Sequence, residues 1–146
     1  MPLEFDRSII GREFDRTETD PVSAESLIAF SKALGETDPR YVENGPDLVG
    51  HPTYCVRYRG RKFLPDDLPA GLNPRMSLDA GKDIEFGRPI RPGDVVSVVS
   101  SVHDIYEKTG RTGTMIFLVV RFTITDQGGE HLATIDNRML WRHHPS

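Results

Sequence analysis

Leucine and phenylalanine recur at helical spacing in residues 23–34, a segment that begins with serine and is followed by Gly35. Serine caps the first turn of a helix well, and glycine adopts the left-handed conformation that closes the last turn. Asp20 and Pro21 offer an alternative start about one turn earlier, because Asp also caps helices and Pro fits the first helical position. The pattern predicts one long helix that ends at Gly35.

The second half of the chain is rich in Val, Ile, Thr and aromatic residues, as strands are. The predicted strands are residues 82–86, 95–106, 112–125 and 131–141. Glycine-containing reversals at residues 108–111 and 126–129 indicate hairpins, and the two prolines of residues 88–94 indicate a rigid turn between the first two strands. We expect a helix followed by a four-stranded antiparallel meander, with a short helix at residues 53–63 in the proline-rich stretch between them.

Residues 115–120, Met-Ile-Phe-Leu-Val-Val, are apolar at successive positions and do not alternate with polar residues. A strand with one face in water alternates, so this run predicts that both faces of the sheet are covered there. The long helix can cover one face. A second copy of the chain or a homologous partner is the expected cover for the other.

The composition is that of one globular domain, residues 1–146, with 37% hydrophobic and 27% charged residues. No apolar run approaches the roughly 20 residues needed to cross a bilayer. The first residues lack the basic and apolar regions of a signal peptide, and Cys55 is the single cysteine. We therefore expect a cytoplasmic protein without membrane contact, and the net charge of −4 does not indicate nucleic-acid binding.

Basic residues nevertheless cluster locally. The first group consists of Arg57, Arg59, Arg61 and Lys62, and the second of Arg88 and Arg91. Exposed charges on a solvated surface explain such clusters in most proteins. The alternative is phosphate recognition, because a guanidinium fits phosphate oxygens bidentately. On that hypothesis Arg57, Arg88 and Arg91 are the candidates for binding a nucleotide carrier such as coenzyme A.

The order of these elements resembles the hot-dog fold of MaoC-like proteins, and especially the N-terminal-type, fatty-acid-synthase-like dehydratase domains. The matching motifs are Phe30 with residues 35–39, residues 52–54, residues 86–94, residues 107–110 and residues 128–130. Such domains also form one subunit of two-chain hydroxyacyl-thioester dehydratases. The resemblance implies an α+β hot-dog fold in which a curved antiparallel sheet wraps one long helix. It also implies edge-to-edge pairing of two units, with an acyl thioester on coenzyme A or acyl carrier protein bound at the interface, and no cofactor.

Catalytic members of this family carry Gly-Asp-x-Asn-Pro-x-His where a helix ends, and residues 35–41 of this chain read Gly-Glu-Thr-Asp-Pro-Arg-Tyr. The catalytic Asp therefore corresponds to Glu36, the Asn to Asp38 and the His to Tyr41. Glu36 keeps a carboxylate but is one methylene longer, and catalytic geometry is sensitive to displacements of about 1 Å. Tyr41 is poorly matched to proton transfer at neutral pH, because a phenol has a reference pKa near 10. Packing at the helix–loop corner is the favoured explanation for Tyr41, with hydrogen-bond donation as the alternative, and an ordinary turn beside Pro39 is the favoured explanation for Asp38.

A further departure lies at His51 and Pro52, where catalytic members have His-Gly and use a backbone N–H to hold the thioester oxygen. Proline has no N–H, so Pro52 removes that donor, a loss typically worth about 100- to 1,000-fold in rate. The other histidines show no metal-ligand spacing, and we expect no metal. Cys55 has no base partner in the sequence and is expected to be a small buried hydrophobe.

Three functions remain open at this point. The first is an accessory subunit that supplies the acyl-thioester-binding half of an (R)-specific enoyl-thioester hydratase or 3-hydroxyacyl-thioester dehydratase, while a homologous partner supplies the Asp and His. The second is a self-sufficient hydratase that uses Glu36 with Tyr41 or His51. The third is a non-catalytic acyl-thioester binding or assembly module that acts with enzymes of lipid or steroid side-chain breakdown.

Overall fold

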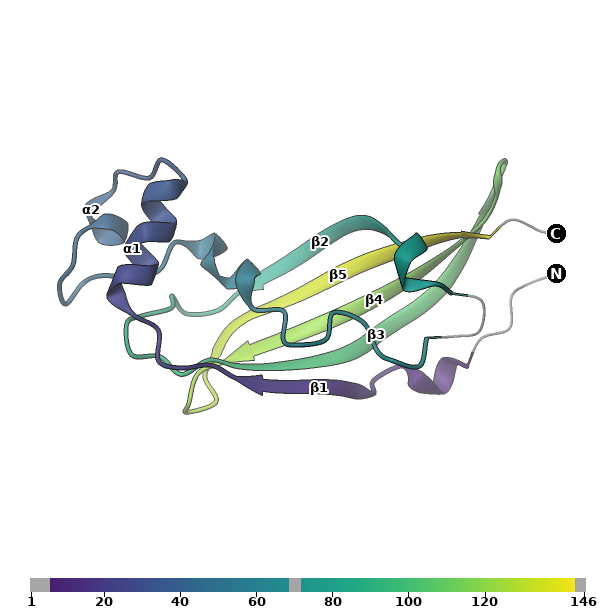
Figure 1. Ribbon diagram of the computed structural model, residues 1–146, viewed down its shortest axis with the longest axis horizontal. Helices are drawn as coiled ribbons and strands as arrows, with labels where there is room; N and C mark the ends of the chain where they lie inside the picture. Colours follow the sequence, from purple (N-terminus) through teal and green to yellow (C-terminus); the bar gives the residue numbers. More distant parts are fainter. Residues whose placement is uncertain (1–5, 69–71, 144–146) are drawn as a thin grey trace.

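A curved antiparallel sheet runs through most of the molecule, and the two α-helices lie at one end of it (Figure 1). The computed structural model describes residues 6–68 and 72–143. In chain order, its 3-10 helices (η), α-helices and strands are η1 (Arg7–Ile9), β1 (Glu13–Glu18), α1 (Ala24–Ala33), α2 (Pro39–Val42), η2 (Pro52–Arg57), η3 (Pro74–Met76), β2 (Leu78–Phe86), β3 (Ser97–Gly110), β4 (Gly113–Thr125) and β5 (His131–His143). Within those described ranges no helix is long and apolar enough to cross a bilayer.

Both ends of α1 are capped as the sequence predicts. Ser23 is the N-cap, and its hydroxyl oxygen accepts the backbone N–H of Ser26 at 3.1 Å, so the helix does not start earlier at Asp20. At the other end Gly35 has φ +79°, and the N–H of Glu36 reaches the carbonyl of Ser31 at 3.1 Å. This is the hydrogen-bonding pattern of a Schellman cap, which aims Glu36 away from the helix axis.

The sheet order is β1-β3-β4-β5-β2, and every neighbouring pair is antiparallel. The predicted meander is confirmed for β3, β4 and β5, but it is wrong for β2, which pairs with β5 and not with β3. Residues 87–96 therefore cross the end of the sheet and do not form a hairpin. The sequence pattern also misses β1, because Phe14 is the only apolar residue of that edge strand.

The two hairpin turns differ in how well the sequence locates them. The β4–β5 turn is confirmed, since the Asp126 side chain accepts the N–H groups of Gly128 and Glu130 at 2.8 and 2.9 Å. The β3–β4 turn lies at Arg111 and Thr112, slightly beyond its predicted position, because β3 continues to Gly110 and not to residue 106 as predicted.

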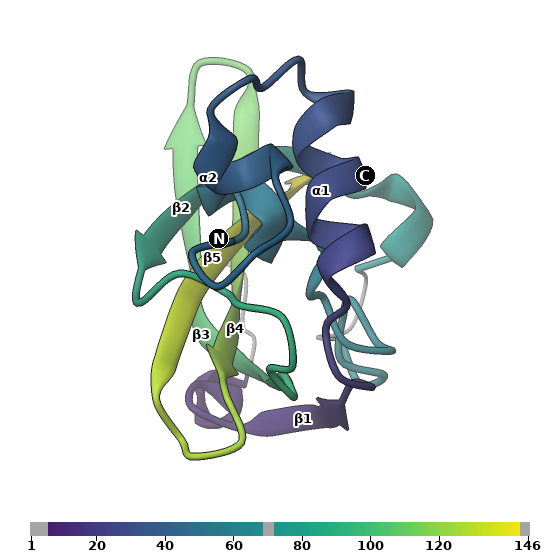
Figure 2. The same cartoon turned by 90° about the vertical axis from the view of Figure 1, so that its left-hand side faces the viewer.

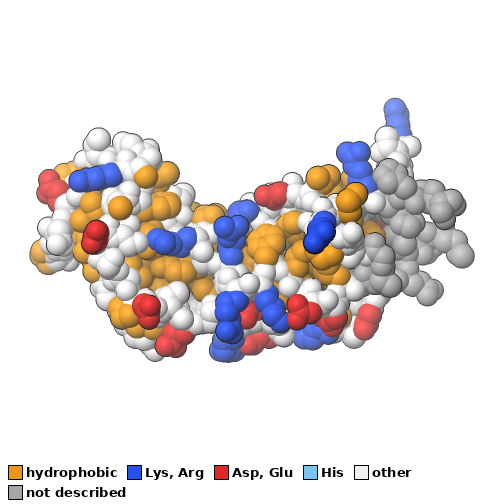
Figure 3. All heavy atoms as spheres, in the orientation of Figure 1, with side chains coloured by type: hydrophobic (Ala, Val, Ile, Leu, Met, Phe, Trp, Pro, Cys, Tyr) orange, Lys and Arg blue, Asp and Glu red, His pale blue; other side chains and the backbone are white. Residues whose placement is uncertain are grey.

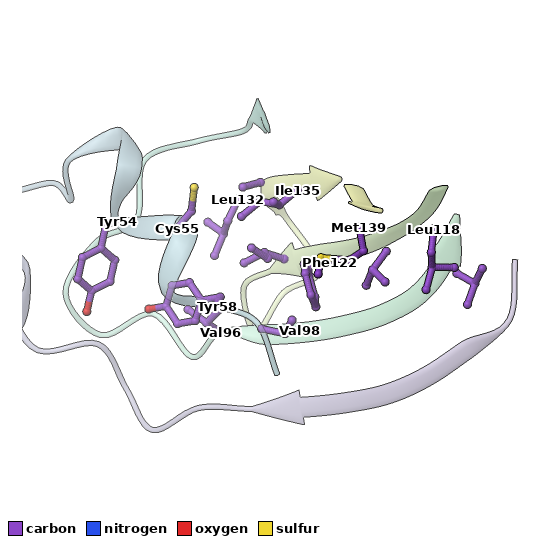
Figure 4. Close-up of a cluster of buried hydrophobic side chains, with 14 of the residues drawn as sticks. Tyr54, Cys55, Tyr58, Val96, Val98, Leu118, Phe122, Leu132, Ile135 and Met139 are labelled. Atoms are coloured by element: carbon purple, nitrogen blue, oxygen red, sulfur yellow. The ribbon is translucent and has the colours of Figure 1, made fainter. Parts of the chain in front are cut away.

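The core lies on the concave face of the sheet. On β4 it consists of alternate residues that are all 4% exposed or less: Ile116, Leu118, Val120, Phe122 and Ile124. Figure 4 shows Tyr54, Cys55 and Tyr58 closing this cluster from the side of η2. Further along, the Phe63 ring lies 6.0 Å from the Phe122 ring.

η2 and the chain after it, residues 58–68, therefore cover the concave face. α1, the expected cover, lies beyond the end of the sheet (Figure 1) and stands in front when the molecule is viewed from that end (Figure 2). Its apolar stripe is narrow, with Leu27 as its fully buried apolar residue. The short helix predicted at residues 53–63 exists only as η2, Pro52–Arg57.

Asp15 of β1 ties this covering segment to the sheet edge. Its buried carboxylate accepts the backbone N–H groups of Arg61 and Lys62 at 2.8 and 3.2 Å. Burial by itself raises the pKa of a carboxyl group, but the N–H donors of Arg61, Lys62 and Arg16 outweigh it, and the pKa of Asp15 is lowered. A charged carboxylate thus holds the loop that follows η2.

The opposite face of β4 is also apolar, as residues 115–120 indicate. Phe117 stacks on Tyr106 of β3 with ring centroids 5.0 Å apart, and the Lys108 ammonium lies over both rings. Val119 is buried as well. A partner chain over this face stays a prediction.

Gly87 marks the point where β2 leaves the sheet. A Cβ atom at this position would lie 2.1 Å from the carbonyl oxygen of His131, which is backbone and cannot rotate away. We expect Gly87→Ala to lower the free energy of unfolding by about 2 kcal/mol or more, measured by urea denaturation. Gly110→Ala is the control, because a Cβ there meets nothing within 4 Å. Equal stability of the two variants would contradict the close approach.

Candidate functional site

A pocket of about 510 Å³ lies between the helical end and the sheet. Figure 3 shows the molecule narrowing into a saddle in this region, with hydrophobic side chains across it. The apolar lining consists of Val49, Pro52, Cys55, Phe86, Pro89, Ile90 and Leu132. The polar lining side chains include Arg40, Tyr41, Asp47 and His51. A largely apolar cavity with a few polar groups is the usual form of a small-molecule site.

Glu36 lies next to His51, a residue that lines this pocket. Its Oε1 atom accepts the backbone N–H groups of Thr37 and Asp38 at 3.0 and 3.1 Å, which fixes the carboxylate. The other oxygen, Oε2, lies 3.8 Å from Nε2 of His51. The Glu36 and His51 side chains are only 29% and 22% exposed. Two of the predicted catalytic candidates are therefore neighbours.

His51 is the N-cap of η2, and this role orients its ring. The N–H of Thr53 donates to Nδ1 at 3.2 Å, and the Thr53 hydroxyl lies 2.8 Å from the same atom. A ring nitrogen that accepts an N–H cannot carry a proton, so the proton of the neutral imidazole is on Nε2, toward Glu36. Thr53 is a residue of the site that its sequence context does not reveal.

Tyr41 and Asp38, the other two candidates, have different surroundings. Tyr41 lines the pocket, with its ring centroid 5.4 Å from that of His51 and the Arg40 guanidinium over its face. Asp38 is the N-cap of α2 and lines a neighbouring groove. Its hydrogen bonds from the Arg40 side chain and backbone lower its pKa. Asp38 thus acts in the turn, while Tyr41 reaches the pocket.

Pro52 forms the wall of the pocket next to His51, and it has no N–H to offer. The N–H of Thr53 is used by the His51 ring, and the N–H of Tyr54 donates to the His51 carbonyl at 2.9 Å. The N–H of Gly50 donates to the carbonyl of Ile90 at 2.7 Å. The backbone N–H groups of Gly50, Thr53 and Tyr54 are therefore all engaged within the chain.

Arg88 lines the pocket, and its guanidinium is bound by surrounding residues of the fold. Its Nε donates to Glu130 at 3.0 Å, one terminal nitrogen to Pro89 O and Asp94 at 2.8 Å each, and the other to Asp94 and Asp126 at 2.9 and 2.5 Å. A guanidinium has five N–H donors, and these contacts use all of them. The bonds to Asp94, Asp126 and Glu130 raise the pKa of Arg88 even though burial opposes its charge.

The other two arginine candidates lie elsewhere. Arg57 is exposed on the opposite side of η2, where it donates to the Ser26 hydroxyl at 3.1 Å and stacks on the Tyr54 ring. It lines a separate cavity of about 260 Å³. Arg91 is exposed in the crossing segment, where its backbone N–H donates to the Asp94 carboxylate at 2.8 Å and its carbonyl accepts the Asp94 N–H at 3.2 Å. The structure does not bring the three arginines together.

Cys55 lies in the pocket wall with its sulfur 3.3 Å from the Pro52 carbonyl. Burial raises the pKa of its thiol, so the side chain is neutral and behaves as a small hydrophobe. Within residues 6–68 and 72–143, no cluster of three or more His, Cys, Asp or Glu side chains is arranged to hold a metal ion.

Solved structures of similar shape define the class of this fold. They include a MaoC-like dehydratase from Rhodospirillum rubrum, with a TM-score of 0.65, 19% identity and 94% of each chain covered. The ChsH1-ChsH2 complex from Mycobacterium tuberculosis has a TM-score of 0.65 at 17% identity, covering 93% of this chain and 86% of that chain. The truncated HadBC (3R-hydroxyacyl-ACP dehydratase) complex from the same organism has the same TM-score and identity, covering 90% and 96%. The fold is therefore the hot-dog fold of MaoC-like proteins, as expected.

The family follows from the sequence comparison. The FAS1-like dehydratase domain region matches residues 8–135, and the chain belongs to this family. A UPF0336 protein from Parafrankia sp. is 30% identical over 91% of this chain and 90% of its own length. A protein named probable enoyl-CoA hydratase alpha subunit, from Thermomonospora curvata, is 27% identical over 86% of this chain, which spans 46% of that relative.

Loss of the Arg88 side chain should destabilise the fold, because it leaves the buried carboxylates of Asp94 and Asp126 without their counter-charge. We expect Arg88→Met to lower the free energy of unfolding by about 3–5 kcal/mol in urea titrations. Arg138→Met is the control, since Arg138 pairs with the exposed Asp83 and should cost about 1 kcal/mol or less. Similar losses in both variants would show that Arg88 is not the central ion pair.

The ion pair between Asp126 and Arg88 should make the free energy of unfolding depend on pH in the acid range. The hydrogen bond with Arg88 lowers the pKa of Asp126 in the folded chain, so the unfolded chain binds more protons at low pH. The stabilisation is complete above the unfolded value of about 3.9 and is lost as the pH falls through the lower, folded value. Asp126→Asn, which keeps an acceptor for the turn, should flatten the dependence of unfolding free energy on pH below about 4. An unchanged slope between pH 2 and 5 would rule out this contribution.

Proposed function

We propose that this chain is the acyl-thioester-binding subunit of an (R)-specific enoyl-thioester hydratase or 3-hydroxyacyl-thioester dehydratase, and that a homologous hot-dog chain supplies the main Asp and His. The observation that carries the proposal is the pocket itself. Its lining is largely apolar with a few polar side chains, the backbone N–H groups of Gly50, Thr53 and Tyr54 donate within the chain, and Pro52 has none. Such a pocket suits binding of an acyl group better than fast chemistry.

The size and lining of the pocket fit an acyl chain. A volume of about 510 Å³ lies within the range of about 300–1,000 Å³ typical of small-molecule sites. Ile90, Leu132 and Phe86 offer apolar surface, on which burial of each CH₂ group contributes about 0.8 kcal/mol. Arg57 and Arg91 remain candidates for the phosphates of the carrier, whereas the donors of Arg88 are all engaged in the fold.

The pocket lies at the end of an unpaired sheet edge, which favours completion by a partner. β2 is an edge strand, and Phe86 at its end is 53% exposed while also lining the pocket. Leu78 and Met76, at and before the start of β2, are exposed as well. Edge strands with apolar side chains are prone to pair with another chain. A hot-dog partner along β2 would extend the sheet and cover Phe86.

Similar proteins support an assembly of two chains. The ChsH1-ChsH2 and HadBC structures are complexes of two named components, and one relative is named as an alpha subunit. The missing family residues at positions 36, 41 and 52 are explained if the second chain carries Gly-Asp-x-Asn-Pro-x-His.

Co-expression tests the proposal directly. With a hot-dog chain from the same genome that carries the intact motif, we expect a heterodimer that hydrates crotonyl-CoA at least about 100-fold faster than this chain alone. Phe86→Glu should abolish the heterodimer in native mass spectrometry, because it places a charge at the paired edge. Leu34→Glu is the matched control, since Leu34 is equally exposed, at 54%, but lies at the end of α1.

Two results would contradict the proposal. One is a stable homodimer of this chain with at least a tenth of the activity of the best heterodimer. The other is tight binding of acyl-CoA by this chain in calorimetry with no association to any motif-bearing hot-dog chain, which would favour a non-catalytic binding module.

A further inference from the structure

The position that corresponds to the family's His is occupied by Tyr41, yet an imidazole stands at the same end of the pocket. It belongs to His51, which comes ten residues later in the chain and faces the Glu36 carboxylate at 3.8 Å. We propose that Glu36 and His51 form a relocated proton-transfer pair that gives this chain a slow hydratase activity in its own pocket. The inference rests on the proposed binding of an enoyl thioester there, and it goes beyond the accessory role.

Both members of the pair are held in place by their own local turns. Two backbone N–H groups occupy Oε1 of Glu36, so Oε2 is the oxygen that faces the imidazole. Thr53 occupies Nδ1 of His51, so the Nε2–H faces the carboxylate. An acceptor oxygen and a donor nitrogen therefore point toward one another beside a pocket that His51 lines. Pre-positioned groups of this kind are what acid–base catalysis requires.

The pair can carry out a balanced addition of water. Oε2 of Glu36 takes a proton from water as the water oxygen bonds to the β-carbon of the enoyl thioester. The Nε2–H of His51 holds the water by a hydrogen bond and keeps its proton. The protonated Glu36 then gives its proton to the α-carbon as the carbon–carbon π bond is lost, so both groups end in their starting states. One water molecule is consumed, and the product is the 3-hydroxyacyl thioester.

The two atoms of the pair lie 3.8 Å apart, which is longer than a hydrogen bond. Catalytic hydrogen bonds often shorten when substrate binds. The absent N–H of Pro52 limits the rate, since one missing oxyanion donor typically costs about 100- to 1,000-fold. The activity should therefore lie above the uncatalysed background and well below that of the two-chain assembly.

Two isosteric substitutions test the pair without removing the turns. In Glu36→Gln the amide oxygen can still accept the N–H groups of Thr37 and Asp38. In His51→Asn the side-chain oxygen can still cap the N–H of Thr53. Urea unfolding should confirm that both variants are folded. His103→Asn is the matched control, because His103 lies beside Arg121 on the outer face of the sheet, away from the pocket.

The assay follows hydration of crotonyl-CoA by the purified full chain in D₂O, with mass spectrometry of deuterium at the α-carbon. We expect slow turnover, a loss of at least about 100-fold in Glu36→Gln and in His51→Asn, and no change in His103→Asn. Turnover that persists in His51→Asn would overturn the inference. Crotonyl-CoA binding in calorimetry without any turnover would overturn it as well while leaving the proposed function standing. A lack of binding would remove both.

Discussion

The Arg88 guanidinium is the interaction on which the rest of this structure depends. It joins the segment that crosses the end of the sheet, through Asp94 and Pro89, to the β4–β5 turn, through Asp126 and Glu130. A half-engaged buried charge would destabilise the fold, because desolvation of an ion costs several kcal/mol. Here every donor of the arginine has an acceptor, so the cluster specifies one position for the crossing segment.

That position in turn forms the pocket. Pro89 and Ile90 follow Arg88 directly and line one wall, and Gly50 is held against this wall by its hydrogen bond to Ile90. Gly87 allows the chain to leave β2 in close contact with His131. The site is thus built where a crossing segment, a sheet end and the loop before η2 meet.

The turn at the start of η2 determines which hydrogen-bonding groups this pocket offers. As the N-cap of η2, the His51 ring is oriented toward Glu36, but the same cap uses the N–H of Thr53. Pro52 suits the first position of a 3-10 turn and supplies no donor. The same turn therefore orients the imidazole and leaves the neighbouring backbone without a free N–H at positions 52 and 53.

The sequence by itself determined the features that depend on neighbouring residues. The Ser23 and Gly35 caps, the β4–β5 turn and the meander of β3, β4 and β5 follow from local propensity and periodicity. The tertiary structure alone decided that β2 joins β5, that η2 covers the concave face, and that Glu36 faces His51. It also revealed the role of Arg88, whose partners Asp126 and Glu130 lie 38 and 42 residues away. Contacts between residues so far apart in the sequence depend on how the sheet curves and closes. A local sequence pattern does not determine that curvature.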